Sequence, residues 1–163
     1  PLPIGHSQTI SQPFIVAIMT DLAGLTPQSH VLEIGTGCGY QAAVLAEIAA
    51  RVVTIERIAS LADDAKARLK RLGYTNVTVL HGDGSRGWPA EAPYDAILVT
   101  AGAAELPHAL LDQLRPGGRM VIPLGRQGYG QSLTVMEKDA DTGEVHESCN
   151  LPVAFVPLLG GLG

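Results

Sequence analysis

The stretch over residues 31–43, VLEIGTGCGYQAA, decides the fold. Its first four residues form a short apolar run typical of a buried strand, and an alanine-rich helix is expected over 40–50. Three glycines at 35, 37 and 39 join the two elements. A backbone that passes close beneath a ligand cannot carry side chains, and tight turns need positive φ. The glycines therefore indicate a ligand-binding loop that brings the start of a helix close to the ligand.

The glycine spacing separates this loop from the dinucleotide fingerprint G-x-G-x-x-G, because position 40 is Tyr. An acid, Glu33, precedes the first glycine by two positions. A loop around a pyrophosphate gains nothing from a carboxylate, whereas a loop near a sulfonium can use one. The stretch resembles the first motif of class I S-adenosylmethionine-dependent methyltransferases, E/D-x-G-x-G-x-G. The alternative is a purely structural glycine turn. On the resemblance, the cofactor-binding residues expected here are Glu33, Gly35, Thr36, Gly37 and Gly39.

The hydrophobic pattern outside the loop alternates strands and helices. Near-continuous apolar runs are typical of parallel strands covered on both faces. Strands are expected over 52–56, 77–80, 96–99 and 119–123, and helices over 13–23, 58–72 and 107–114. Two further strands, 132–138 and 145–156, flank a turn and predict an antiparallel hairpin. We therefore expect an α/β fold, a Rossmann-like, doubly wound and mostly parallel sheet. Helices would cover both its faces, with the antiparallel hairpin at the edge.

Composition narrows the class of protein. The length of 163 residues suits a single domain over 1–163, and 46% hydrophobic against 17% charged residues is the balance of a packed core. The net charge of -5, without a basic stripe, argues against a nucleic-acid partner. No apolar run is long enough to span a bilayer. Two cysteines distant in sequence favour a reducing cytoplasm, and the absence of a Cys/His cluster predicts no metal.

Acids at the ends of the next two strands extend the expected cofactor site. Glu56 ends the strand over 52–56, where a carboxylate can accept both ribose hydroxyls, and Arg57 follows it. The alternative is a solvated glutamate. Asp83 and Gly84 follow the strand over 77–80 and resemble the acid that faces adenine in the superfamily, with glycine allowing backbone along a flat ring. The alternative is an ordinary Asp-Gly turn.

The segment 3–13, PIGHSQTISQP, resembles the signature of protein-L-isoaspartate (D-aspartate) O-methyltransferases. The stretches GDGS at 82–85, APYDAI at 92–97 and FVPL at 155–158 agree with this family. LRPGGR at 114–119 resembles a structural turn motif common to class I methyltransferases. Ser7 stands where the family usually has Gly, and Cys38 where it often has Ser. The family's N-terminal helical segment, of roughly fifty residues, is expected to be missing before Pro1.

The resemblance implies methyl transfer from S-adenosyl-L-methionine, with S-adenosyl-L-homocysteine as product. The acceptor would be the free carboxylate of L-isoaspartyl or D-aspartyl residues in damaged proteins, which starts their repair. A carboxylate with a reference pKa of about 4 is already ionised at neutral pH and needs no strong base. The family match makes Ser11 the active-site residue and places Gln8, Thr9, Ile10 and Ser11 against the substrate. From the residues alone, a helix cap just before Gln12 and Pro13 is the favoured role of Ser11, and the two roles are compatible. The chain is expected to act as a monomer.

Two other functions stay open on the sequence. A class I methyltransferase acting on a small molecule or RNA would keep Glu33, Glu56 and Asp83 without needing the 3–13 segment. A module that binds S-adenosylmethionine without turnover is the other. A dinucleotide oxidoreductase is disfavoured by the glycine spacing.

Overall fold

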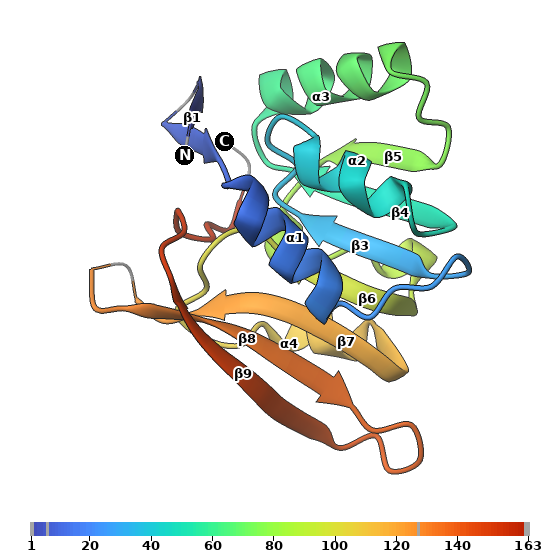
Figure 1. Cartoon of the computed structure of the whole chain (residues 1–163), viewed down its shortest axis with the longest axis vertical. Helices are drawn as coiled ribbons and strands as arrows, with labels where there is room; N and C mark the ends of the chain where they lie inside the picture. The colour runs from blue at the N-terminus through green and yellow to red at the C-terminus, as the bar shows by residue number, and fades with distance from the viewer. Residues whose placement is uncertain (1, 6, 127, 162–163) are drawn as a thin grey trace.

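The computed structural model describes residues 2–5, 7–126 and 128–161. Its centre is a seven-stranded sheet in the order β5-β4-β3-β6-β7-β8-β9 (Figure 1). Neighbouring strands from β5 to β7 are parallel, and β8 and β9 are antiparallel to their neighbours. The strands are β3 (His30–Ile34), β4 (Arg51–Glu56), β5 (Val77–His81), β6 (Tyr94–Val99), β7 (Leu114–Leu124), β8 (Gln131–Lys138) and β9 (Val145–Val153). The expected sheet, with its antiparallel edge, is confirmed.

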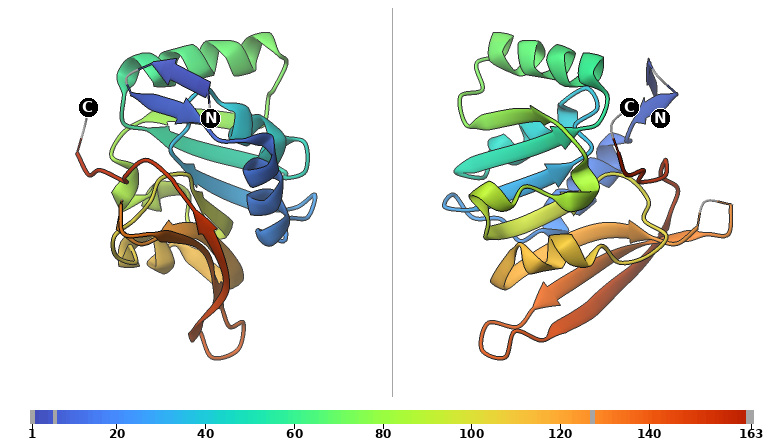
Figure 2. Two further views of the ribbon diagram at one scale, coloured as in Figure 1. Left: turned by 60° about the vertical axis from the view of Figure 1, so that its left-hand side comes forward. Right: turned by 180° about the vertical axis from the view of Figure 1, so that it is seen from behind.

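Helices cover both faces of this sheet (Figures 1 and 2). Alternation along β6 shows why: Ala96 and Leu98 pack in one buried cluster with residues of α1 and α2, whereas Ile97 and Val99 pack in another with residues of α4. A strand whose successive side chains point to opposite faces must be apolar throughout when both faces are covered. The helices are α1 (Pro13–Leu22), α2 (Tyr40–Ala46), α3 (Ala59–Arg71) and α4 (His108–Asp112), with short 3-10 turns η1 (Gly84–Arg86) and η2 (Pro89–Glu91).

Several element boundaries differ from the sequence expectations. The helix expected over 40–50 ends at Ala46, where the Asn76 side chain donates to the Ala46 and Ala49 carbonyls at 2.9 and 3.1 Å and satisfies the end of the helix. The strand expected at 119 begins at Leu114, because the LRPGGR turn already pairs with β6. The strand expected over 145–156 ends at Val153. Each boundary depends on a partner distant in sequence.

A small hairpin that the hydrophobic pattern did not predict precedes α1. Strands β1 (Leu2–Gly5) and β2 (Gln8–Ile10) pair only with each other, outside the main sheet. Ser7 occupies the turn with φ +58°, a left-handed backbone that is strained for a residue with a side chain. The hairpin lies over the glycine loop, since a Cβ built on Gly37 would come within 3.2 Å of Ile4 Cδ1. His6 lies outside the described residues.

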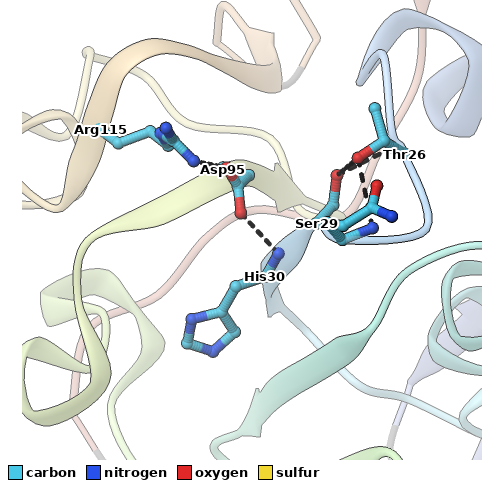
Figure 3. A network of polar contacts seen from close by, with 6 residues as sticks. Thr26, Ser29, His30, Asp95 and Arg115 are labelled. Atoms are coloured by element: carbon cyan, nitrogen blue, oxygen red, sulfur yellow. Dashed lines mark hydrogen bonds and ion pairs between the residues drawn. The ribbon is translucent and has the colours of Figure 1, made fainter.

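At the amino ends of the parallel strands, Asp95 links β6 to β3 and β7 (Figure 3). One carboxylate oxygen accepts a hydrogen bond from the His30 backbone N–H at 2.7 Å, and the other pairs with the Arg115 guanidinium. The contact fixes where β3 starts relative to β6. The His30 ring lies against Tyr94, with ring centroids 4.8 Å apart, and burial lowers the pKa of this histidine.

Replacing Asp95 tests this anchor. Asp95→Ala leaves the His30 N–H without its acceptor, so we expect it to lower the free energy of unfolding by about 1–3 kcal/mol in urea denaturation. Arg115→Ala is the matched control, because it breaks only a half-exposed ion pair and should cost less than about 1 kcal/mol. Equal losses in the two variants would contradict the anchoring role of Asp95.

Candidate functional site

A cavity opens where the carboxyl ends of β3 and β4 meet the β1–β2 hairpin and the chain after β9. It is open to solvent, and its empty space together with that open solvent amounts to about 990 Å³. It lies beside the point where the sheet order reverses between β3 and β6, the usual ligand position in such sheets. The sequence-predicted residues that line it are Gln8, Thr9, Ile10, Ser11, Gly35, Thr36, Gly37, Glu56, Arg57 and Gly84.

The glycine loop forms the floor of this cavity because its backbone is drawn against two strands. The Gly35 and Thr36 amides donate to the Ile55 carbonyl at 2.9 and 3.3 Å. Gly35 has φ +94°, and a Cβ there would come within 2.5 Å of the Thr100 hydroxyl. That hydroxyl lies 2.7 Å from the Gly35 carbonyl oxygen. Only glycine satisfies both the backbone angle and the close approach at position 35.

Glu56 ties the loop to the end of β4. Its two carboxylate oxygens accept hydrogen bonds from the Gly37 N–H at 2.9 Å and the Ile58 N–H at 3.0 Å. The side chain lines the cavity yet is only 6% exposed, so the alternative of a solvated glutamate is wrong. Each carboxylate oxygen has a second lone pair that can accept from a ligand hydroxyl.

Glu33 lies beneath the loop and not in the cavity wall. It is fully buried, and one carboxyl oxygen accepts a hydrogen bond from the Thr54 hydroxyl at 2.5 Å. The Thr54 hydroxyl is 2.6 Å from that of Thr36, which does line the cavity. The structure therefore places Glu33 two hydroxyl groups away from any ligand, in contrast to the direct cofactor contact expected from the motif. Gly39, also expected at the cofactor, instead begins α2 and packs on Leu69.

Burial changes the charge state of Glu33. Removal from water raises the pKa of this carboxyl to about 8; the nearby Glu56 charge adds to the rise, whereas the Thr54 hydrogen bond opposes it. The other carboxyl oxygen has no hydrogen-bond partner among the described residues. A proton on the carboxyl removes the penalty of an unpaired buried charge. Glu33 is thus a neutral group at pH 7.

Asp83 is engaged elsewhere than at the cavity. One carboxylate oxygen accepts from the Ser85 hydroxyl at 2.6 Å and its N–H at 3.0 Å, and the other accepts from the Gly161 N–H at 2.8 Å. These contacts, the Ser85 hydroxyl foremost, hold the pKa of Asp83 below its usual range. They match the Asp-Gly turn alternative, and the adenine contact stays a prediction. Gly84 does line the cavity, and a Cβ there would come within 2.5 Å of Ile34 Cγ2.

Ser11 lies between β2 and α1 and faces the cavity. Its hydroxyl makes no hydrogen bond with a described residue, and the first turn of α1 has no side-chain cap. The N-cap position is held by Gln12, whose carbonyl accepts from the Val16 amide at 3.1 Å. The helix-cap role for Ser11 is therefore wrong in this structure, and its hydroxyl is available to a ligand.

Part of the cavity wall comes from residues that sequence reasoning did not assign. Thr100 and Ala101, which follow β6, and residues 156–159, which follow β9, line it. Apolar side chains close to the glycine loop were missed. Most of these residues lie next to a motif residue in the sequence. That position indicates that they are near the site, but it does not show whether their side chains point into the cavity. The missed lining residues are Ile4, Val16, Ile34, Cys38, Tyr40, Gln41, Ile55 and Ile58.

No group of three or more His, Cys, Asp or Glu side chains within 2–5, 7–126 and 128–161 could hold a metal ion. No helix in these ranges has both the length and the apolar character needed to cross a membrane.

The whole chain, 1–163, matches the family model described as Protein-L-isoaspartate(D-aspartate) O-methyltransferase. Protein-L-isoaspartate O-methyltransferase 2 of Syntrophobacter fumaroxidans is 58% identical over 161 residues, covering 99% of this chain and 65% of that protein. Protein-L-isoaspartate O-methyltransferase 1 of Nitrosospira multiformis is 60% identical, covering 99% of this chain and 68% of that protein.

Solved structures give the same similarity. A protein-L-isoaspartate O-methyltransferase superposes with a TM-score of 0.86 at 34% identity, covering 96% of this chain and 50% of the other. The putative enzyme from Plasmodium falciparum in complex with S-adenosyl-L-homocysteine superposes with a TM-score of 0.83 at 28% identity, covering 98% of this chain and 79% of the other. The chain thus spans half of the first of these two solved relatives and about four fifths of the second.

A pH series tests the neutral state of Glu33. Its pKa is about 8 in the folded chain and about 4.5 when unfolded, so the unfolded chain binds fewer protons between these values. Stability contributed by this site therefore falls as pH rises through that window, by up to about 1.4 kcal/mol per pH unit. Glu33→Gln removes this dependence, and we expect its unfolding free energy, relative to the wild type, to rise from about pH 5 to pH 8 in urea denaturation.

Glu144→Gln, in the exposed β8–β9 turn, is the matched control and should run parallel to the wild type, because its carboxylate meets water in both states. Parallel profiles for Glu33→Gln and the wild type would show that Glu33 is ionised in the folded chain.

Proposed function

Because the chain belongs to the protein-L-isoaspartate(D-aspartate) O-methyltransferase family, we propose that it methylates the free carboxylate of L-isoaspartyl or D-aspartyl residues in damaged proteins. S-adenosyl-L-methionine would be the donor and S-adenosyl-L-homocysteine the product. The observation that carries the proposal is the hydroxyl of Ser11, which has no partner among the described residues and faces the cavity whose floor is the glycine loop.

The residues around the cavity fit this cofactor. Gly35 and Gly37 leave no side chain between the loop backbone and a ligand, and Glu56 retains lone pairs for the ribose hydroxyls. Gly84 offers backbone to a flat ring, and Arg57 has a buried Nε without a partner among the described residues. When bound, the cofactor supplies a methyl group made electrophilic by the sulfonium sulfur.

The chain's own residues have a modest chemical task. The substrate carboxylate is ionised well below pH 7, so no side chain needs to remove a proton from it. Ser11 can donate a hydrogen bond to one carboxylate oxygen and thereby orient the other toward the methyl group. The β1–β2 hairpin and the apolar residues 156–159 keep competing water from the reacting atoms. Alignment of this kind can supply several kcal/mol, up to about 7–11 in favourable systems.

Repair then follows without further help from the protein. The methyl ester is an activated acyl group, so the neighbouring backbone nitrogen attacks it, expels methanol and forms a succinimide. Hydrolysis of that ring yields normal aspartate in part of the molecules. The finer features that we propose are a single domain acting as a cytoplasmic monomer. The net charge of -5 supports a protein substrate over a nucleic acid.

Paired peptides test the function directly. An isoaspartyl peptide and its normal aspartyl twin are offered with labelled S-adenosylmethionine, and methanol release after alkaline hydrolysis is measured. We expect transfer to the isoaspartyl peptide alone, because the two differ only in the position of the free carboxylate. Equal transfer to both, or cofactor binding with transfer to neither, would overturn the proposal.

Two substitutions separate the roles of hydroxyl and carboxylate. Ser11→Ala removes one hydrogen bond to a charged substrate group, so kcat/KM for the isoaspartyl peptide should fall about 10- to 100-fold. Its dissociation constant for S-adenosylhomocysteine, measured by calorimetry, should change less than about twofold. Glu56→Ala should weaken cofactor binding about tenfold or more and lower the melting temperature, because the Gly37 N–H loses its acceptor.

Ser11→Thr keeps the hydroxyl and is the control for Ser11→Ala, so it should retain more transfer than the alanine variant. If Ser11→Ala and Glu56→Ala lose cofactor affinity equally, this division of roles is wrong.

A further inference from the structure

The chain after β9 forms one wall of the cavity. We call residues 155–161 the C-terminal strap; it continues from the end of β9 toward the 3-10 turn η1 (Figure 2). Four of its residues, 156–159, line the cavity. They form a part of the wall that is separate from the glycine loop and from the strand ends at which the cofactor would bind. The strap is therefore placed to contact whatever ligand approaches the cofactor from outside.

A buried glutamine holds the start of this strap. The Gln131 side chain is 6% exposed. Its carboxamide oxygen accepts a hydrogen bond from the Phe155 N–H at 2.6 Å, and its carboxamide nitrogen donates to the Phe155 carbonyl at 3.3 Å. One side chain thus pairs with both backbone groups of one residue, as a neighbouring strand would. A carboxamide can accept and donate at once, whereas an ionised Glu accepts only and an apolar side chain does neither.

The strap is also hydrogen-bonded to Gly102, in the loop after β6, and Gln131 contacts this loop as well. The Gly102 N–H donates to the Val156 carbonyl at 2.7 Å, and the Leu158 N–H donates to the Gly102 carbonyl at 2.8 Å. Gly102 packs directly on the glutamine, because a Cβ there would come within 2.1 Å of the Gln131 Nε2 atom. The carboxamide is therefore wedged between the strap and the loop after β6, and both depend on its position.

The strap keeps backbone groups that an extended peptide could use. Within the part of the chain that the structure describes, the Val156 N–H, the Leu158 carbonyl and the Leu159 N–H have no hydrogen-bond partner. Substrates chosen by damage and not by sequence must be bound mainly through their backbone, and unpaired N–H and C=O groups on an extended segment recognise peptides in that way. The Leu159 side chain is 49% exposed and offers an apolar contact beside them.

We propose that Gln131 is a positioning residue for the peptide substrate: its carboxamide fixes the C-terminal strap so that the strap backbone binds the polypeptide on either side of the damaged residue. The inference rests on the proposed function, because it assigns the peptide side of the same site. Gln131 touches neither substrate nor cofactor and acts only through the strap.

The test compares peptide affinity with cofactor affinity. Gln131→Met keeps the side-chain length and loses both hydrogen bonds, and Gln131→Glu keeps the acceptor alone. Calorimetry measures the dissociation constant of S-adenosylhomocysteine, and then that of an isoaspartyl peptide with S-adenosylhomocysteine bound. We expect Gln131→Met to weaken peptide binding about tenfold while cofactor affinity changes less than about twofold. In steady-state assays the loss should appear in KM for the peptide and not in kcat.

Thr134→Val is the matched control. Thr134 is buried in the same strand, β8, but its hydroxyl bonds only to the nearby Ser132 carbonyl, so this variant should lose stability without losing peptide affinity. Hydrogen exchange gives a second readout: the Leu158 N–H should exchange faster in Gln131→Met and at the wild-type rate in Thr134→Val. That measurement holds even where Gln131→Glu fails to fold.

The possible outcomes distinguish the positioning role of Gln131 from the proposed methyltransferase function. A Gln131→Met chain with unchanged peptide affinity, or with equal loss of peptide and cofactor, overturns the positioning role, as does a wild type that binds no isoaspartyl peptide. A wild type that binds the peptide and shows the Gln131 effect, yet transfers no methyl group, overturns the proposed function alone.

Discussion

The hydrogen bond from the Gly37 N–H to the Glu56 carboxylate is the contact on which the site depends. It joins the loop after β3 to the end of β4, and the second oxygen of the same carboxylate holds the Ile58 N–H where α3 begins. A single buried group thus sets the height of the glycine loop above the sheet. Because the loop is drawn down, its backbone and not its side chains forms the cavity floor, which is the condition for close contact with a nucleoside ligand.

Beneath this floor, the polar groups are arranged to avoid a buried charge. Glu33 lies in the middle of an apolar sheet, and desolvation keeps it protonated at neutral pH. The hydroxyls of Thr54 and Thr36 then lead from the carboxyl to the cavity. Burial beneath the loop, and not the side-chain chemistry of a glutamate, therefore sets the charge state of Glu33.

The walls of the cavity come from the two ends of the described chain. The β1–β2 hairpin brings Ser11 to one side, and the C-terminal strap brings an apolar surface with unpaired backbone groups to the other. Neither segment belongs to the parallel sheet, so each needs its own attachment: Ile4 rests over Gly37, and Gln131 with Gly102 holds the strap. Under the proposed function, this separation would let the sheet bind the cofactor while the two attached segments contact the polypeptide substrate.

The sequence by itself determined the sheet and the glycine loop, because apolar periodicity and glycine spacing are local properties of the chain. The family followed from the resemblance of the 3–13 segment to the family signature, and Ser11 and Glu56 line the cavity. Tertiary structure decided the rest. The burial of Glu33 and the contact of Asp83 with Gly161 depend on partners far away in sequence. The β1–β2 hairpin is local in its own pairing, but its place over the glycine loop depends on the distant contact of Ile4 with Gly37. The pairing of Gln131 with Phe155 spans 24 residues and leaves no pattern in either segment. A hydrogen bond between distant segments exists only once the sheet has brought them together, and so no local pattern predicts it.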